Sequence, residues 1–60
     1  MKFRVVAEVW NQGSVIRRYT RTVDAESKIE AACAVEQRLL ADGLLTADER
    51  GKTEMKVRME

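Results

Sequence analysis

The stretch Lys2–Trp10 limits what this chain can fold into more than any other stretch does. The odd positions from Phe3 to Val9 are all apolar, which gives one dry face at the period of a β-strand. The even positions are only half polar, because Val6 and Trp10 lie among charged residues. Apolar residues on both faces are typical of a central strand with cover on each side. We expect the chain's own helix on one side and a partner on the other.

The chain has 60 residues, which we interpret as a single small domain over residues 1–60. A domain of this size buries only about 60% of the surface of its unfolded chain. Its stability is therefore marginal unless disulfides, a bound metal or oligomerisation add to it. Cys33 is the only cysteine, which excludes an intramolecular disulfide. With no histidine and no calcium-binding loop motif, the sequence predicts neither a metal nor a cofactor.

Hydropathy predicts no membrane association. The sequence has no run of about 18 apolar residues, and its N-terminus lacks the apolar core of a signal peptide. We therefore expect a reduced, cytoplasmic protein.

The net charge is +1, but the charges are unevenly placed. Residues 1–23 contain five basic residues and one acidic residue, whereas residues 24–50 contain three basic and seven acidic residues. The expected strands are thus basic and the expected helix is acidic. This uneven charge distribution bears on which partners the protein binds, and it does not bear on the fold.

A hairpin is expected at the N-terminus. Asn11–Ser14 is a turn signal, and Val15–Val23 is rich in β-branched residues. A turn of two or four residues would place Glu8 opposite Arg17 and Val6 opposite Tyr19. A three-residue turn would place Val5 opposite Tyr19. We prefer the first register for its ion pair and its apolar cross-strand pair, and it puts Tyr19 on the outer face.

A helix is expected next. Ser27 and Glu30 fit a capping box, with Asp24 as an earlier start, and Asp42-Gly43 ends the helix. Its apolar stripe is expected to comprise Ile29, Ala32, Cys33, Leu39 and Leu40, with Cys33 as a buried, inert thiol. Glu36 falls near the middle of that stripe. It either lies at the rim, pairs with a strand arginine such as Arg18, or meets a partner.

The C-terminal segment predicts a third strand. Lys52–Glu60 alternates apolar and charged residues, and Thr46–Glu49 reads as a short helical turn before it. The fold class is therefore α+β, with a three-stranded antiparallel sheet of β-β-α-β sequence, strand order 2-1-3, and one helix on one face.

No catalytic motif is present. The three glycines are isolated, which excludes a glycine-rich phosphate loop, and no histidine is available as a general base. The acidic residues read as the solvated face of a helix. We expect a protein that is not an enzyme.

The outer face of the sheet is the candidate site. Aromatic and cationic residues of this kind dominate protein–protein hot spots, and they also stack bases and follow phosphates on single-stranded nucleic acid. Intervening valines favour a protein partner, with nucleic acid as the alternative. A homodimer is a further expectation, through an edge strand or through this outer face. The candidate partner-binding residues are Arg4, Val6, Trp10, Arg17, Tyr19, Arg21, Lys56 and Arg58.

A resemblance adds to this prediction. The basic hairpin ends in Val23-Asp24-Ala25-Glu26-Ser27 and runs into an alanine-rich helix, and over residues 3 to 42 this pattern resembles very small proteins of phages and mobile elements. Some of those proteins are inhibitors of host machinery, including anti-CRISPR proteins. The resemblance implies a stoichiometric protein-binding inhibitor, and it transfers no functional residues.

Overall fold

The computed structural model describes residues 1–60 as one antiparallel sheet with helices on one side. The strand order is β2-β1-β3, so the expected α+β fold with β-β-α-β sequence and order 2-1-3 is confirmed. A short 3-10 helix, η1, precedes the last strand where a helical turn was expected. The elements are β1 (Lys2–Asn11), β2 (Ser14–Asp24), α1 (Lys28–Ala41), η1 (Ala47–Lys52) and β3 (Thr53–Met59).

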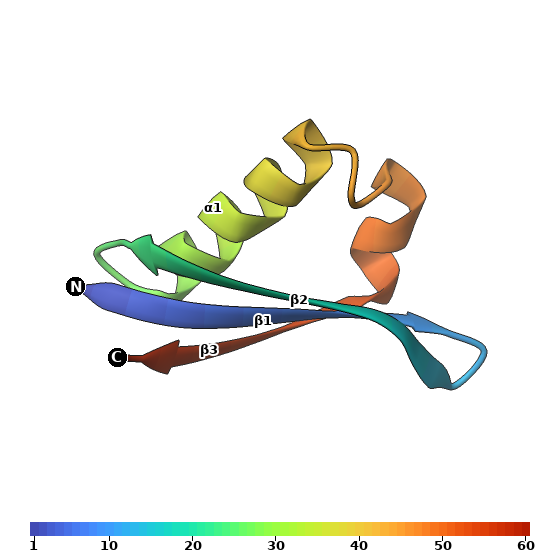
Figure 1. Ribbon diagram of the computed structural model, residues 1–60, viewed down its shortest axis with the longest axis horizontal. Coiled ribbons are helices and arrows are strands. Elements are labelled where there is room, and N and C mark those ends of the chain that lie inside the picture. The colour runs from blue at the N-terminus through green and yellow to red at the C-terminus, as the bar shows by residue number, and fades with distance from the viewer.

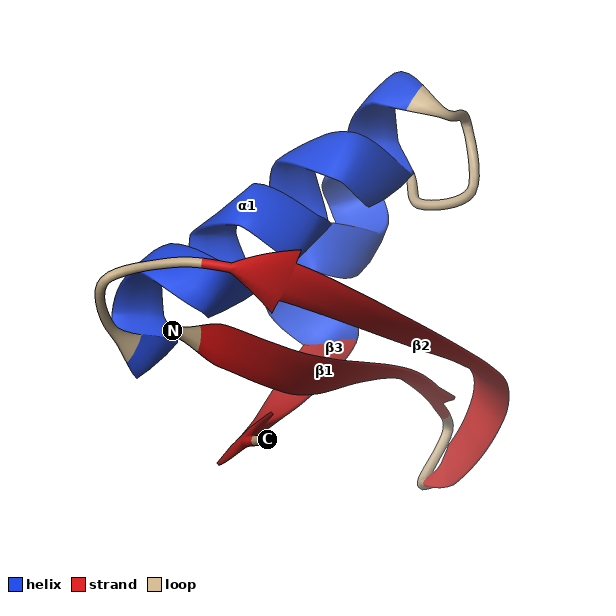
Figure 2. Ribbon diagram, turned by 60° about the vertical axis from the view of Figure 1, so that its left-hand side comes forward, coloured by secondary structure: helices blue, strands red, loops and turns tan.

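The molecule has two layers. Figure 1 shows α1 and η1 above the sheet and nothing below it, with both termini at the same end of the sheet. The view in Figure 2 shows how the three strands twist beneath α1. The expected central strand is confirmed, because β1 pairs with β2 on one side and with β3 on the other. Only one face of β1 is covered by its own chain.

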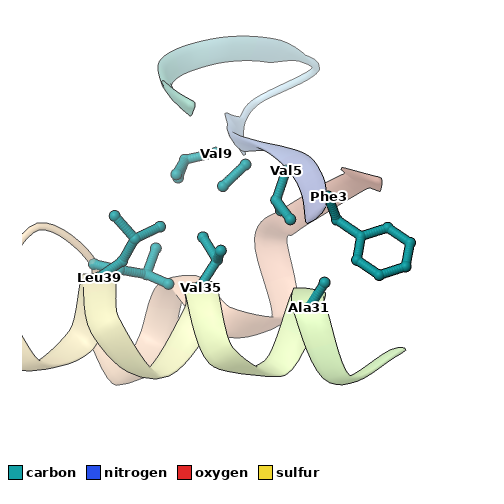
Figure 3. Close-up of a cluster of buried hydrophobic side chains, with 8 residues drawn as sticks. Phe3, Val5, Val9, Ala31, Val35 and Leu39 are labelled. Carbon is teal, nitrogen blue, oxygen red and sulfur yellow. The ribbon is translucent and has the colours of Figure 1, made fainter. Parts of the chain in front are cut away.

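The core lies between the sheet and α1. Figure 3 shows Phe3, Val5 and Val9 of β1 on the side of the strand that faces α1, with Ala31, Val35 and Leu39 of the helix pointing toward them. Leu45 follows the helix and closes the end of the core. The fully buried apolar residues are Phe3, Val5, Ala7, Val9, Ala31, Val35, Leu39 and Leu45.

Local capping sets both ends of α1. Ser27 is the N-cap, and its hydroxyl accepts a hydrogen bond from the amide of Glu30 at 3.2 Å, as the capping signal predicted. At the other end, Gly43 has a φ of 72°, which the predicted glycine stop requires. The amide of Leu44 donates to the carbonyl of Leu39 at 2.9 Å, which completes a Schellman motif.

The expected helix stripe is partly wrong. The buried ridge is Ala31, Val35 and Leu39, spaced four residues apart, whereas Ile29 is 79% exposed and the thiol of Cys33 is also exposed. Spacing by four concentrates small and branched side chains against β1, and this packing rotates the larger Ile29 outward. Which helix residues are buried therefore depends on their position on the helix rather than on their size, because Leu39 and Ile29 are isomers and only Leu39 is buried.

The turn of the hairpin contains Gln12 and Gly13, which have φ values of 51° and 82°. These left-handed conformations are those of a two-residue turn between twisted strands. The first pair beyond the turn signal, Trp10 opposite Val15, follows the preferred register. A bulge then leaves Ile16 without an opposite residue and shifts the rest of β2 by one position.

The expected pairing is wrong beyond this bulge. Glu8 lies opposite Arg18 instead of Arg17, and Val6 no longer faces Tyr19. The alternative register with Val5 opposite Tyr19 does not occur either. Since a shift of one residue exchanges the faces of a strand, the side chains of β2 are reversed relative to expectation.

The reversal places Arg17, Tyr19 and Arg21 on the helix side of the sheet. There Tyr19 packs against the core, and its ring covers apolar surface that water would otherwise contact. This burial is the physical reason for the shift in register. An outer-face position for these three residues is therefore excluded.

Candidate functional site: the open face of the sheet

The face of the sheet opposite α1 is called here the open face. It combines charged, hydroxyl and apolar side chains from all three strands, and no part of the chain lies over it (Figure 1). Its members are Arg4, Val6, Glu8 and Trp10 of β1, Val15, Arg18, Thr20 and Thr22 of β2, and Glu54, Lys56 and Arg58 of β3.

Glu8 is the centre of a three-strand ion cluster on the open face. The Nη2 and Nε atoms of Arg18 donate to Oε2 of Glu8 at 2.8 and 3.0 Å. The Nζ atom of Lys56 lies 3.1 Å from Oε1 of the same carboxylate. The two cations cover Glu8, which is only 4% exposed. One carboxylate thus joins β2, β1 and β3.

The cluster fixes the charge of Glu8. Hydrogen bonds from Arg18 and then Lys56 lower the pKa of Glu8 below its usual value of 4.5, against a smaller opposing effect of burial. The carboxylate is therefore ionised and fully engaged at neutral pH. Both of its oxygens are therefore held by cations of the neighbouring strands.

Of the two other cations of the open face, Arg4 is also paired and Arg58 is not. The Nε atom of Arg4 lies 3.3 Å from Oε2 of Glu60, to which the Thr22 hydroxyl donates at 3.4 Å. Glu54 and Arg58 form no ion pair within the chain. Together with Glu60, the open face carries four cations and three carboxylates, and its two unpaired charges are Glu54 and Arg58 of β3.

Trp10 marks one end of the open face. Its ring is 37% exposed and borders an open recess of about 320 Å³. Gly51, Lys52, Thr53 and Glu54 form the rest of the recess. A partly exposed aromatic side chain beside a recess is typical of a residue that contacts a partner.

The helix-side residues of β2 have structural contacts. The guanidinium of Arg17 forms an ion pair with Glu49, which raises the pKa of Arg17 and lowers that of Glu49. The hydroxyl of Tyr19 donates to the carbonyl of Leu44 at 3.0 Å. Arg21 lies over the Tyr19 ring, 5.9 Å from its centroid. These contacts hold β2 to the segment that follows α1.

The structure therefore divides the predicted site. Arg4, Val6, Trp10, Lys56 and Arg58 lie together on the open face, while Arg17, Tyr19 and Arg21 do not. Sequence reasoning missed Arg18, Thr20, Thr22 and Glu54, which occupy that face instead.

The sequence of β2 does contain a signal that indicates which of its faces lies toward the core. Tyr19 and Val23 share odd numbers with the apolar residues of β1, and apolar residues of neighbouring strands face the core together. This match favours the observed register over the expected one.

Glu36 of α1 lies at the rim of the buried stripe, one of the three arrangements expected for it. Its carboxylate accepts from Nη2 and Nε of Arg50 in η1, at 2.9 and 3.2 Å, rather than from Arg18. No three of the acidic and thiol side chains gather into a group that could hold a metal ion. Neither helix has the length and apolar content needed to span a membrane.

No protein-family model, curated protein or solved structure matches this chain.

Proposed function

We propose that this protein is a small, non-catalytic binding module that docks a protein partner against the open face of its sheet. In this proposal it acts in the cytoplasm and stoichiometrically, by occupying a surface of its target, as small inhibitors of phage and mobile-element type do. The supporting observation is the open face itself: a whole side of a three-stranded sheet without cover, with Trp10 exposed at its end.

Charge pairing favours a protein over a nucleic acid as the partner. A phosphate backbone is bound by cations that are free to replace its counterions. On the open face, Arg4, Arg18 and Lys56 are already bound to carboxylates, and Arg58 alone has no intramolecular partner. A tryptophan beside paired charges and threonines is the composition of a protein contact surface.

Affinity capture with matched variants tests this function. The protein is immobilised and exposed to lysate of its source cells, alongside Trp10→Ala on the open face and Gln37→Ala on the exposed side of α1. A true target is retained by the wild type and by Gln37→Ala and is lost with Trp10→Ala. Because a buried aromatic anchor contributes at least about 2 kcal/mol, calorimetry with the purified target should show about a thirtyfold weaker complex for Trp10→Ala.

Nucleic acid binding is tested separately by Trp10 fluorescence. Single-stranded oligonucleotide should leave the emission unchanged at every salt concentration. Quenching that weakens as salt rises would instead support a nucleic-acid-binding function for this face. A target that Trp10→Ala binds with wild-type affinity would remove the open face as the protein-binding site.

A further inference from the structure

The outer edge of β3 has backbone groups that no part of the chain uses. The amide of Glu60 donates to the carbonyl of Lys2 at 2.9 Å, so the even positions of β3 direct their backbone groups toward β1. The odd positions therefore direct theirs away from the sheet. The free donors and acceptors belong to Met55, Val57 and Met59, together with the carbonyl of Thr53, whose amide donates to the carbonyl of Arg50.

This edge is complementary to itself about Lys56. The strand Thr53–Met59 has Lys56 at its midpoint, so an antiparallel copy centred there pairs the strand over its whole length. Met55 would then lie opposite Val57 of the copy, in a pair that exchanges backbone hydrogen bonds. Any other register with the same faces leaves an end of the strand unpaired.

The charges of β3 fit the same arrangement. A copy centred on Lys56 places Glu54 opposite Arg58 of the other copy, twice. These are the two β3 charges that form no ion pair within the chain. Lys56 itself would face Lys56 of the copy, but each ammonium is turned to its own Glu8 at 3.1 Å. The pairing thus adds two attractions between Glu54 and Arg58, while the repulsion between the two Lys56 side chains stays small.

The helix side of the same edge is apolar. Met55 and Val57 are half-buried beside the core, and Met59 is 60% exposed. A second β3 strand would bring the matching side chains of the copy against them. A chain this short gains from such burial, because its own core comprises few residues.

The other edge lacks this fit. On β2 the bulge at Ile16 interrupts the ladder, and Arg17, Arg18 and Arg21 line the strand. Bulges and charged side chains are the usual protection of an edge against pairing with another chain. Self-association is therefore expected at β3 rather than at β2.

We propose that two copies of this protein pair antiparallel through β3 about a two-fold axis at Lys56, forming a continuous six-stranded sheet. The helices of both copies then lie on one side and the two open faces join on the other. This inference uses the edge of the sheet and is independent of whether the open face binds a protein.

Charge exchange tests the pairing. Sedimentation equilibrium of the wild type should give twice the chain mass of 6.9 kDa. Glu54→Arg alone places two arginines opposite each other at two points, and Arg58→Glu alone does the same with carboxylates. Each single variant should raise the dimer dissociation constant at least about tenfold, and the double variant should restore it. Restoration separates a broken interface from a misfolded chain.

Cross-linking tests the register. In a Cys33→Ser background, Lys56→Cys places two cysteines opposite each other in a pair without backbone hydrogen bonds, where Cα atoms are about 4.5 Å apart. Mild oxidation should give a covalent dimer. Met59→Cys in the same background is the matched control and should remain monomeric on a denaturing gel, because residue 59 lies opposite Thr53 of the copy and this variant keeps the charge pairs.

Two results would overturn the proposal. One is a wild-type mass of a single chain from micromolar to millimolar protein. The other is a dimer that neither single charge variant weakens, or in which Lys56→Cys does not cross-link. A failure of this kind leaves the capture experiment unaffected, because Trp10→Ala changes none of the charges or backbone groups of β3 on which the pairing depends.

Discussion

The hydroxyl of Tyr19 on β2 donates a hydrogen bond to the carbonyl of Leu44, 3.0 Å away, and so joins the edge of the sheet to the end of the helix. This contact exists only because the bulge at Ile16 turns Tyr19 toward α1. The bond gives a partner to the carbonyl of Leu44, which lies two residues after the helix C-cap Asp42.

Tyr19→Phe should therefore lower the free energy of unfolding by about 0.5–1.5 kcal/mol, the usual net value of one hydrogen bond. Urea denaturation followed by circular dichroism measures this change. Thr20→Val is the control, because Thr20 is exposed on the open face and its replacement should alter stability by less than about 0.5 kcal/mol. Equal stability of Tyr19→Phe and the wild type would mean that Tyr19 faces solvent.

The ion cluster of Glu8 predicts a pH dependence of stability. The folded pKa of Glu8 is lowered by Arg18 and Lys56, so its contribution is complete above the usual value of 4.5 and is lost as the pH falls through the lowered value. Glu8→Gln removes this contribution. The wild type should thus be more stable than Glu8→Gln at neutral pH, and the difference should shrink in acid.

Urea midpoints measured between neutral pH and the acid range check this sign. Thr20→Val is the matched control, since Thr20 is exposed on the open face and carries no ionisable group. Its difference from the wild type should stay nearly constant over the same range. A Glu8→Gln difference that grows in acid would contradict the cluster.

The orientation of α1 predicts unequal costs for two apolar truncations. Leu39→Ala empties a fully buried site and should reduce the free energy of unfolding by about 2–5 kcal/mol. Ile29→Ala shortens a side chain that is already 79% exposed. It should change the free energy of unfolding by less than about 0.5 kcal/mol. Thermal unfolding of both variants makes the comparison. A cost for Ile29→Ala as large as that for Leu39→Ala would restore the helix stripe that the sequence predicted, in which both residues are buried.

The sequence alone determined the elements and their order. Alternation along Lys2–Trp10 and Lys52–Glu60, the Ser27 cap and the Gly43 stop are local signals, because each depends on residues within a turn or a strand of one another. The apolar residues on both faces of the first strand were enough to place it in the centre of the sheet.

Tertiary packing decided which side chains of β2 share a face with those of β1, and which side of α1 is buried. The bulge at Ile16 places Tyr19 against the core and Arg18 opposite Glu8. Both contacts join residues that are distant in the sequence. The rotation that buries Ala31 and exposes Ile29 likewise depends on the shape of β1 beneath the helix. A strand has a period of two and a helix a wide apolar arc, so a small gain in packing can shift either one without changing the local pattern.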